Sequence, residues 1–445
     1  MKGQLWETRP LEFWAKAKEL RARWQKSIES KEKVVGQGNN AEFRFNWVPA
    51  FPAITLIEDN PVGSMMQARE SVFARKARLA SEIRGWGREL CGYVNNCWGA
   101  QFLGYQADGS PFPQRKLVVP VPCPCDQHTK RGQQVRDFEN VPQWSSDRPV
   151  YFGPHDEQRD KPLLEHRVYC NLKIINDIER IFGQKCDDEK LTTLFKGQKQ
   201  IKEYAIEISL LMARTIPSPL SVKDLYSVFT IGGLTRGNPE DAIAFWKMVR
   251  DEVKWRADNL IAAVGNERFR WIEAHPPPWH FLKYYRYMEQ YGAVCLGSQY
   301  SHVMSGMLEF KPDGSIGARD IPAYPDDTPV KTREDVIRVA MSPEARRLDT
   351  MKMDEYVRRS GIVEFAEIFQ ADGAILPVWR HGVGCTLTRK EQAMYLKEAG
   401  LSVMHYEGSQ PGDRTDLDEM RLLDQLDSWM QSLGLRRIEA QGGRQ

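Results

Sequence analysis

Three cysteines in different parts of the chain have the clearest capacity for chemistry. Cys91 lies in LCGYVNNCWG, Cys125 in PCPCDQHTK and Cys385 in RHGVGCTLT. Each segment suits a loop that meets a helix, where the helix dipole favours a thiolate. Thiolates that separate loops contribute singly can hold an iron–sulfur cluster and still leave one iron open to a substrate. For each cysteine, the alternative is a buried residue that serves only as a small apolar side chain.

The loop around Cys125 carries the densest group of candidate ligands. Cys123, Cys125 and His128 follow a short apolar strand, in a turn that alternating prolines stiffen. Open α/β sheets bind ligands beyond the C-terminal ends of their strands, which is where this loop lies. A zinc site is disfavoured because zinc usually takes two closely spaced ligand pairs, and the sequence has no CxxC or HxxxH. A ferredoxin-type cluster loop is disfavoured because no C-x2-C-x2-C run occurs.

Histidines follow two later predicted strands. The loop EAHPPPWHF holds His275 and His280, and the loop RHGVGC holds His381 close to Cys385. Together with His128, these histidines are the candidate catalytic residues, because histidine exchanges protons near neutral pH. A solvated surface histidine is the alternative for each of them.

The composition and the missing motifs argue against several classes of protein. The chain has 445 residues, 41% of them hydrophobic, and a formal net charge of +2, which gives no electrostatic reason to expect nucleic acid or a membrane surface. No apolar stretch approaches the roughly 20 residues of a membrane span, and the N-terminus has no apolar signal core, so we expect a cytoplasmic protein. Its 8 cysteines are too sparse for a disulfide scaffold. The absence of GxxxxGK[ST], GxGxxG and GxSxG motifs argues against a phosphate loop, a bound nicotinamide and a serine hydrolase.

Alternating strand and helix patterns predict the α/β class. We expect two doubly wound parallel-sheet domains, flavodoxin-like or Rossmann-like, with an N-terminal helix and a helical middle section. An irregular, proline-rich segment is expected between the strand AVCLGS and the helix MDEYVRRSGIVEFAEIFQ. The predicted units are an N-terminal helical segment 1–40, a first α/β domain 41–190 with Cys91 and Cys125, a helical connector 191–265, a second α/β domain 266–435 with Cys385, and a mobile tail 436–445.

The order of several segments resembles a known family. From about Phe43 to Gly434 the chain is similar to the 2-hydroxyacyl-CoA dehydratase and benzoyl-CoA reductase subunits, and most to the larger cluster-binding subunit of an ATP-dependent benzoyl-CoA reductase. The segments that carry the resemblance are CGYVNN, the pair Cys125-Asp126, RFRWIEAHPPPW, ADGAILPVWRHGVGCTLTRKEQ and HYEGSQPGDRTD. The preference for the reductase depends on the length of the chain and on the aromatic residues Trp98, Phe102, Tyr105 and Trp279, on which a flat aromatic thioester would stack.

The resemblance implies a cofactor and its ligands. In that family three cysteines bind a [4Fe–4S] cluster, and the matching positions here are Cys91, Cys125 and Cys385. Cys97 and Cys123 are competing ligands in the same loops. The resemblance further implies a hetero-oligomer with a homologous cluster-bearing subunit, ATP-hydrolysing activator subunits and reduced ferredoxin as the electron source.

The expected reaction is an oxidoreductase step of anaerobic aromatic degradation. An acyl-CoA-binding subunit of a benzoyl-CoA reductase would help to reduce the aromatic ring of its acyl-CoA substrate by two electrons, giving a cyclohexadiene carbonyl-CoA. One alternative is a subunit of a 2-hydroxyacyl-CoA dehydratase, which removes water by radical chemistry. The other is a non-catalytic scaffold subunit.

Overall fold

The structure of the protein is a computed structural model in which most of the chain is described. The described residues are 4–29, 33–37, 47–58, 71–119, 126–144, 157–228, 231, 239–274, 277–298, 308–318, 330–347, 355–380, 389–408 and 417–438. Four of the predicted site residues lie outside these ranges, namely Cys125, His275, His381 and Cys385. His128 lies in a described helix, but its side chain is not described.

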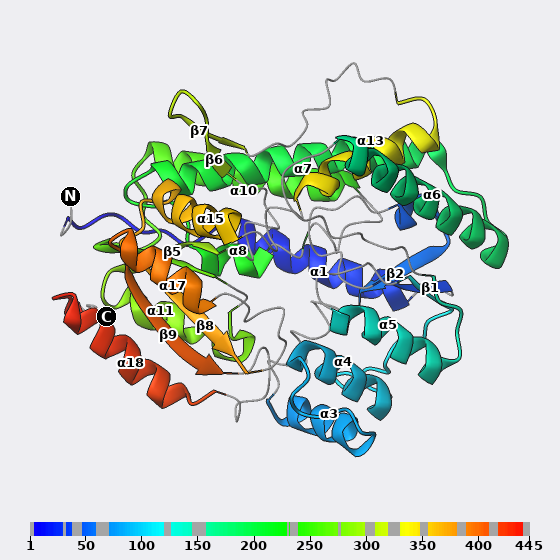
Figure 1. Ribbon diagram of the computed structural model, residues 1–445, viewed down its shortest axis with the longest axis horizontal. Helices are drawn as coiled ribbons and strands as arrows, with labels where there is room; N and C mark the ends of the chain where they lie inside the picture. The colour runs from blue at the N-terminus through cyan, green and yellow to red at the C-terminus, as the bar shows by residue number, and fades with distance from the viewer. Residues whose placement is uncertain are drawn as a thin grey trace.

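Helices make up most of the described chain, and its strands form two parallel sheets and the antiparallel pair β6–β7 (Figure 1). The helices are α1 (Phe13–Glu29), α3 (Ser71–Ile83), α4 (Gly92–Leu103), α5 (Asp126–Glu139), α6 (Glu157–Phe182), α7 (Asp188–Arg214), α8 (Val222–Val228), α10 (Pro239–Asp258), α11 (Lys283–Glu289), α13 (Arg333–Arg347), α15 (Glu355–Ile368), α17 (Arg389–Glu398) and α18 (Glu419–Ser432), with short 3-10 turns at Val48–Ala50 and Trp279–Phe281. The strands are β1 (Lys33–Gln37), β2 (Ile54–Glu58), β3 (Leu117–Val119), β4 (Phe269–Glu273), β5 (Ala293–Ser298), β6 (Leu308–Phe310), β7 (Ile316–Ala318), β8 (Gly373–Trp379) and β9 (Ser402–Gly408).

The first parallel sheet has three strands in the order β2-β1-β3. Its buried residue Leu117 shares a hydrophobic core with Ile175 of α6, Leu191 of α7 and Ile337 of α13. α13 comes from the segment expected to be irregular and lies far along the chain from this sheet. That expectation was wrong, because the apolar side chains of α13 complete the core of the first sheet instead of remaining in a surface loop.

The second parallel sheet has four strands in the order β5-β4-β8-β9. Helices cover both of its faces. Phe269 of β4 packs edge-on against Trp429 of α18, with ring centroids 5.3 Å apart. Arg270, the next residue, points to the opposite face and donates to the carbonyl of Phe369, just after α15. The sheet is therefore buried on both sides, as expected for parallel strands with apolar sequences, and the predicted α/β class is confirmed.

The expected helical section comes between the two sheets in the chain, and its helices α7 and α10 lie side by side along the top of the view in Figure 1. α10 buries Phe245 and Trp246, and Phe13 of α1 packs edge-on against Phe245 with ring centroids 6.4 Å apart. Arg256 near the end of α10 donates to the carbonyl of Pro10 at 2.8 Å. The N-terminal helix is thus attached to the middle section by both apolar and polar contacts.

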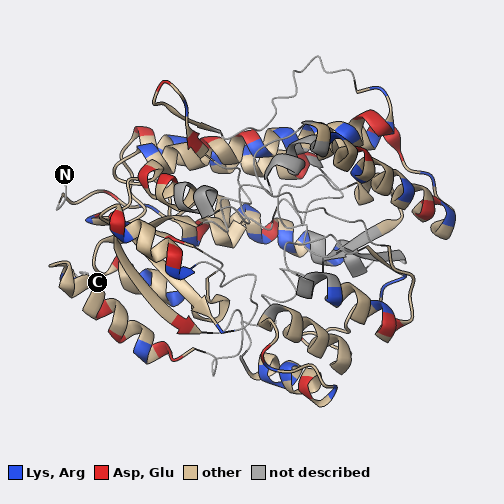
Figure 2. Cartoon of the chain, viewed as in Figure 1, with Lys and Arg blue, Asp and Glu red and all other residues tan. Residues whose placement is uncertain are grey.

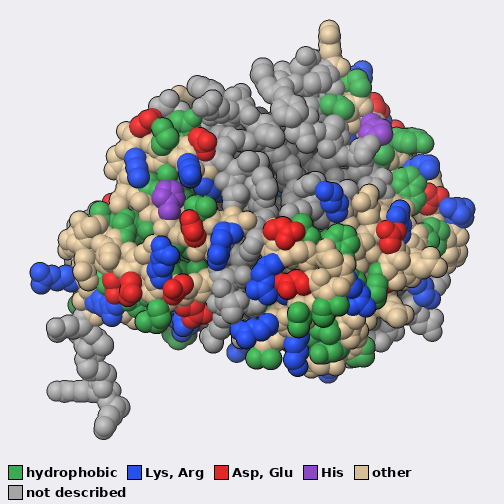
Figure 3. Space-filling view, turned by 60° about the horizontal axis from the view of Figure 1, so that its bottom comes forward, with side chains coloured by type: hydrophobic (Ala, Val, Ile, Leu, Met, Phe, Trp, Pro, Cys, Tyr) green, Lys and Arg blue, Asp and Glu red, His purple; other side chains and the backbone are tan. Residues whose placement is uncertain are grey.

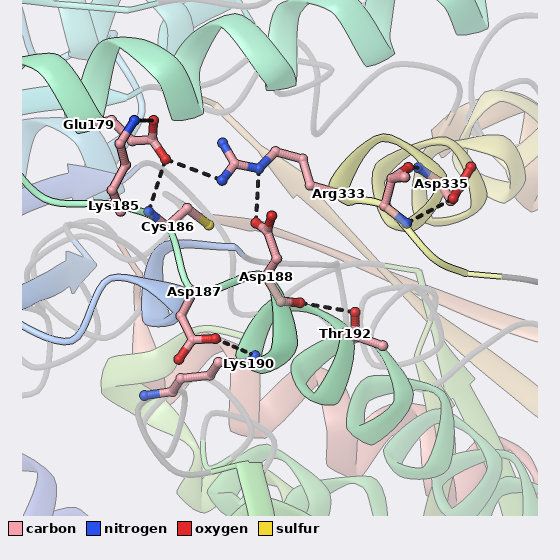
Figure 4. A network of polar contacts seen from close by, with 10 residues as sticks. Glu179, Lys185, Cys186, Asp187, Asp188, Lys190, Thr192, Arg333 and Asp335 are labelled. Atoms are coloured by element: carbon pink, nitrogen blue, oxygen red, sulfur yellow. Dashed lines mark hydrogen bonds and ion pairs between the residues drawn. The ribbon is translucent and has the colours of Figure 1, made fainter.

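A polar network joins α6, α7 and α13 at one end of the first core (Figure 4). Glu179 accepts hydrogen bonds from the backbone N–H of Cys186 (3.0 Å), from Lys185 (3.0 Å) and from Arg333 (3.2 Å). Arg333 also donates to Asp188 at 2.9 Å. Burial acts to raise the pKa of Glu179, but the Cys186 N–H and the two cations outweigh it and lower the pKa. An ionised carboxylate therefore holds α13 against the α6–α7 turn.

Charges of both signs are interspersed along the long helices (Figure 2). The outer face of α3 differs, because it exposes Val72, Leu79 and Ile83 beside Arg75 and Lys76. Figure 3 turns this edge of the molecule forward and shows hydrophobic and basic side chains together on it. None of the helices in the described ranges is long and apolar enough to cross a membrane.

Candidate functional site

The strand order of the second sheet reverses direction between β4 and β8. The chain passes from β4 to β5 on one side and later enters β8 on the other side of β4. β4 and β8 run parallel and end at the same edge of the sheet, at the kind of reversal point where open α/β sheets generally bind ligands. The loop after β4 holds His275 and His280, and the loop after β8 holds His381 and Cys385. Four of the predicted site residues thus belong to the two loops at this reversal point.

The first sheet has the same kind of reversal between β1 and β3. The chain passes from β1 to β2 on one side, and β3 then pairs with the other edge of β1. Cys123 and Cys125 lie in the segment 120–125, between the end of β3 at Val119 and the start of α5 at Asp126. Cys125 and Cys385 therefore follow strands that occupy equivalent topological positions in two different sheets.

Cys91 is the one predicted ligand whose surroundings are described. It is the N-cap residue of α4 and is 6% exposed. Its carbonyl accepts the N–H groups of Val94 and Asn95, both at 3.0 Å, so the helix begins directly after it. The positive end of the helix dipole favours negative charge at this position, and a cysteine thiolate is a ligand of the type that binds iron–sulfur clusters. Cys97, its competitor, is buried inside the same helix.

The ligand set as a whole stays a prediction. Within the described ranges, no three His, Cys, Asp or Glu side chains converge to hold a metal ion, and two of the three predicted cysteines fall outside those ranges. Among the histidines, His280 is described: it lies in the short 3-10 turn before α11 and is partly buried.

The aromatic rings expected to form a platform for the substrate belong to Trp98, Phe102, Tyr105 and Trp279. Trp98 is 2% exposed and packs on Trp86, with ring centroids 4.2 Å apart. Trp279 is 1% exposed and packs edge-on against Tyr226 at 5.2 Å. The other two rings also make edge contacts with neighbouring phenylalanines. The expectation of an open platform was wrong for both tryptophans, because their rings are packing elements of the core.

One polar cluster at the edge of the second sheet was not predicted from the sequence. Glu273, the last residue of β4, is fully buried and accepts hydrogen bonds from three tyrosines. Tyr284 donates to Oε2 at 2.7 Å, Tyr285 donates to both carboxylate oxygens at 2.7 Å, and Tyr226 donates to Oε1. Burial raises the pKa of Glu273 to about 7, although the tyrosines and the hydroxyl of Ser298 act in the opposite direction.

A sequence signal for this cluster exists. A glutamate that ends a run of apolar strand residues must find partners if the strand is buried, because a buried carboxylate without hydrogen bonds is very unfavourable. The adjacent Tyr284 and Tyr285 follow within the next helix. Two neighbouring tyrosines ten or so residues after a strand-terminal glutamate would have suggested the contact.

Comparison with known proteins places the chain. The family model described as "2-hydroxyglutaryl-CoA dehydratase, D-component" matches residues 74–428, which include the whole second sheet and, of the first sheet, β3. The chain belongs to this family. It is 24% identical over 232 residues to the (R)-phenyllactyl-CoA dehydratase alpha subunit of Clostridium sporogenes, a match that covers 52% of this chain and 55% of that protein. It is 23% identical over 255 residues to the (R)-2-hydroxyisocaproyl-CoA dehydratase alpha subunit of Clostridioides difficile, covering 54% of this chain and 59% of that protein.

The comparisons test both the predicted family and the choice between its dehydratase and reductase members. The resemblance to the 2-hydroxyacyl-CoA dehydratase side of the family is confirmed. The likeness to a benzoyl-CoA reductase subunit is not shown, because both relatives are named as dehydratase subunits. Each match spans only a little more than half the length of the relative.

Proposed function

We propose that this chain is an acyl-CoA-binding subunit of a 2-hydroxyacyl-CoA dehydratase. The observation that carries the proposal is the match of the dehydratase family over residues 74–428. It replaces the ring-reduction hypothesis, whose main structural support was an aromatic platform for a flat substrate. Since Trp98 and Trp279 are enclosed in the core, that support is gone, and the dehydratase is the better hypothesis.

The proposal assigns Cys91, Cys125 and Cys385 as the ligands of a [4Fe–4S] cluster. Cys91 fits such a group, since it is a buried thiol at the positive end of α4. Cys125 and Cys385 follow β3 and β8, the strands at the two reversal points. When bound, a cluster of this kind supplies single electrons at low potential.

The chain's own side chains would bind the thioester, exclude water and move protons. The edge of the second sheet at which β4 and β8 end is the proposed place for the acyl group. His275, His280 and His381 belong to the loops after β4 and β8 and are the proposed proton donors or acceptors there, with His128 at the start of α5 on the other sheet. Enclosure of the site would protect a radical intermediate of the substrate from water.

The proposal includes partners. Both relatives are named as alpha subunits, so a second, homologous cluster-bearing subunit is proposed. ATP-hydrolysing activator subunits, supplied with electrons by reduced ferredoxin, are proposed from the family resemblance, because the sequence has no phosphate loop of its own. The substrate is proposed to be a 2-hydroxyacyl thioester of coenzyme A.

The test is an anaerobic preparation of the complex, co-expressed with its partner subunits, followed by assays of turnover and electron use. For the dehydration of a 2-hydroxyacyl-CoA, we expect far less than one electron to be consumed for each product molecule, because the electron is recycled after each turnover. Consumption of two electrons for each benzoyl-CoA reduced would instead support the reductase. Iron-free, active protein would contradict the cofactor assignment.

Single-cysteine variants test the ligands. We expect C91A, C125A and C385A to lose bound iron, acid-labile sulfide and activity. C97A and C123A are the matched controls, since they remove the competing cysteine of the same segment, and they should keep all three. Full iron content in C385A, or loss of iron in C123A together with its retention in C125A, would show that the ligand set is wrong.

A further inference from the structure

The geometry around Glu273 ties together three elements at the edge of the second sheet. The carboxylate belongs to the end of β4, Tyr226 to α8, and Tyr284 and Tyr285 to the first turn of α11. These tyrosine hydroxyls all point to one carboxyl group that is fully buried. The helix before the sheet and the helix after the strand are therefore attached to the same two oxygen atoms.

The loop between β4 and α11 spans this attachment. Its described part includes Trp279 and His280, and its undescribed part includes His275. Glu273 lies at the start of the loop, and Tyr284 and Tyr285 follow its end. The ring of Tyr226 also packs edge-on against Trp279 at 5.2 Å. Glu273 therefore precedes the loop and bonds to the two tyrosines that follow it. It also bonds to Tyr226, whose ring packs against Trp279 in the turn of the loop.

The hydrogen bonds of the cluster depend on the charge of Glu273. An ionised carboxylate accepts O–H groups at both oxygens, whereas a protonated carboxyl has become a donor at one of them. On protonation, at least one tyrosine hydroxyl must turn or lose its acceptor. The tyrosine hydrogen bonds that attach the loop are therefore strongest when Glu273 is ionised, although burial of that charge lowers the stability of the folded chain as a whole.

Glu273 is also the member of the cluster whose charge changes near neutral pH. Its partners are hydroxyl groups, and burial raises its pKa to about 7. Burial raises the pKa values of the surrounding acids well above their ordinary range, which leaves them neutral: Tyr226 of α8, Tyr284 and Tyr285 of α11, Cys295 of β5 and Tyr406 of β9. Lys223 of α8 and Glu289 of α11, which carry opposite charges, pair with each other at 2.5 Å.

We propose that Glu273 is a positioning residue which, through its tyrosine partners, holds the described turn Trp279–Phe281 and with it His280 in the arrangement that the reaction requires. The inference rests on the proposed function for its catalytic consequence. The attachment of the loop to the carboxylate can be tested without any turnover.

The first experiment measures the attachment in the full chain by hydrogen–deuterium exchange of peptides that cover residues 274–285. At pH 8, where Glu273 is ionised, we expect these peptides to exchange about tenfold faster in E273Q than in the wild type, as for the loss of one hydrogen bond to a charged group. Y287F is the matched control, because Tyr287 lies on the same helix but donates to Asp427 at 2.7 Å. Equal exchange in E273Q and the wild type would overturn the proposal.

The second experiment follows the proton itself by infrared difference spectroscopy of the complex between pH 5 and 9. We expect a carboxyl band that titrates near neutral pH in the wild type and is missing in E273Q. Removing one donor, in Y226F or Y284F, should move the titration upward by about one pH unit, since hydroxyl hydrogen bonds favour the carboxylate. Y287F should leave it in place. A band that ignores Y226F and Y284F would contradict the assignment, even if E273Q does not fold.

The third experiment connects the attachment to catalysis through the pH profile of kcat/KM. The wild type should gain activity as pH rises through neutrality, E273Q should lose this limb, and Y226F should shift it upward together with the infrared band. A purely structural role would lower activity equally at every pH and would overturn the catalytic part of the proposal. If the wild type dehydrates no 2-hydroxyacyl-CoA, the proposed function fails, while the exchange and infrared results still decide whether Glu273 holds the loop.

Discussion

Glu179 and Glu273 are glutamates that each accept several hydrogen bonds, but they lie in different surroundings and their pKa values move in opposite directions. Glu179 lies at the α6–α7 turn and accepts from a backbone N–H and from the cations Lys185 and Arg333. Glu273 lies at the C-terminal edge of the second sheet, and its partners are tyrosine hydroxyls. The pKa of the first is lowered, and that of the second is raised to about 7.

The difference shows that the depth of burial and the charge of the donors, rather than the number of donors, set the direction of the pKa shift. Burial acts to raise the pKa of both carboxyl groups. At Glu179 the burial is less deep, and the backbone N–H of Cys186 together with the cations Lys185 and Arg333 outweighs its effect on the pKa, so the ionised carboxylate attaches α13. At Glu273 neutral hydroxyls offset only part of the effect of burial, and the group is left able to exchange a proton near neutral pH. Groups with pKa values shifted toward neutrality concentrate at functional sites, which agrees with the position of Glu273 beside the candidate site.

The largest expected difference between the two regions is in the effect of removing the carboxylate. E273A leaves three buried hydroxyls without their acceptor and creates a cavity, so we expect the free energy of unfolding to fall by about 4 kcal/mol. E179A exposes its partners to water, and we expect a loss of about 1 kcal/mol. Urea denaturation of both variants at pH 7 measures the two values. If E179A were the more damaging substitution, the distinction between a buried cluster and a partly solvated ion-pair network would be incorrect.

The second expected difference is the sign of the pH dependence. The pKa of Glu273 in the folded chain, about 7, lies above its ordinary value of 4.5. Its contribution to stability is therefore fully present below pH 4.5 and is lost as pH rises to about 7, by about 3 kcal/mol. Glu179 behaves in the opposite way, because its lowered pKa gives a contribution that is present above 4.5 and lost as pH falls.

Isosteric amides separate these two contributions. In E273Q the free energy of unfolding should no longer fall as pH rises from 4.5 to 7. In E179Q it should fall less than in the wild type as pH drops below 4.5. A series of urea midpoints from pH 4 to 8 for the wild type and both variants provides the measurement. Identical pH dependence of E273Q and the wild type would mean that Glu273 keeps an ordinary pKa.

Much of the fold could be predicted from the sequence, because the signals were local. The apolar runs FRWIE and AVCLGS became buried parallel strands, and the long periodic patterns became α6, α7 and α10. Two elements were missed for a non-local reason. The residues of β1 pair with residues at least 21 positions later in the chain, as Val34 pairs with Thr55. α13 is buried because its apolar side chains pack against α6 and α7. Neither short segment has a pattern that decides its structure alone.

The candidate site was predictable to a different extent. The strand-then-loop pattern predicts Cys125, Cys385 and the candidate histidines beyond the C-terminal ends of strands, but the strand order that pairs β4 with β8 cannot be inferred from local patterns. The cluster around Glu273 was out of reach for a similar reason. Tyr226 lies 47 positions before Glu273, and its hydroxyl meets the carboxylate only after α8 packs on β5. The buried tryptophans were misinterpreted because the sequence shows that a ring is large and does not show which side of it is covered.

The smallest expected effect is that of removing one cation from the network around Glu179. R333Q removes the cation that bonds both Glu179 and Asp188, so the pKa of Glu179 should rise and the acid-side decline in stability should begin at a higher pH. We expect a loss of about 1 kcal/mol at pH 7, together with faster hydrogen exchange in α13.

R338Q is the matched control for this prediction, since Arg338 belongs to the same helix and pairs with Glu165 and Glu334 instead. It should leave the titration of Glu179 unchanged, and neither variant should move the carboxyl band of Glu273. If R333Q shifted that band, the two carboxylates would belong to one coupled system. Independent behaviour would establish that each glutamate takes its pKa from its own immediate partners, as their different donors require.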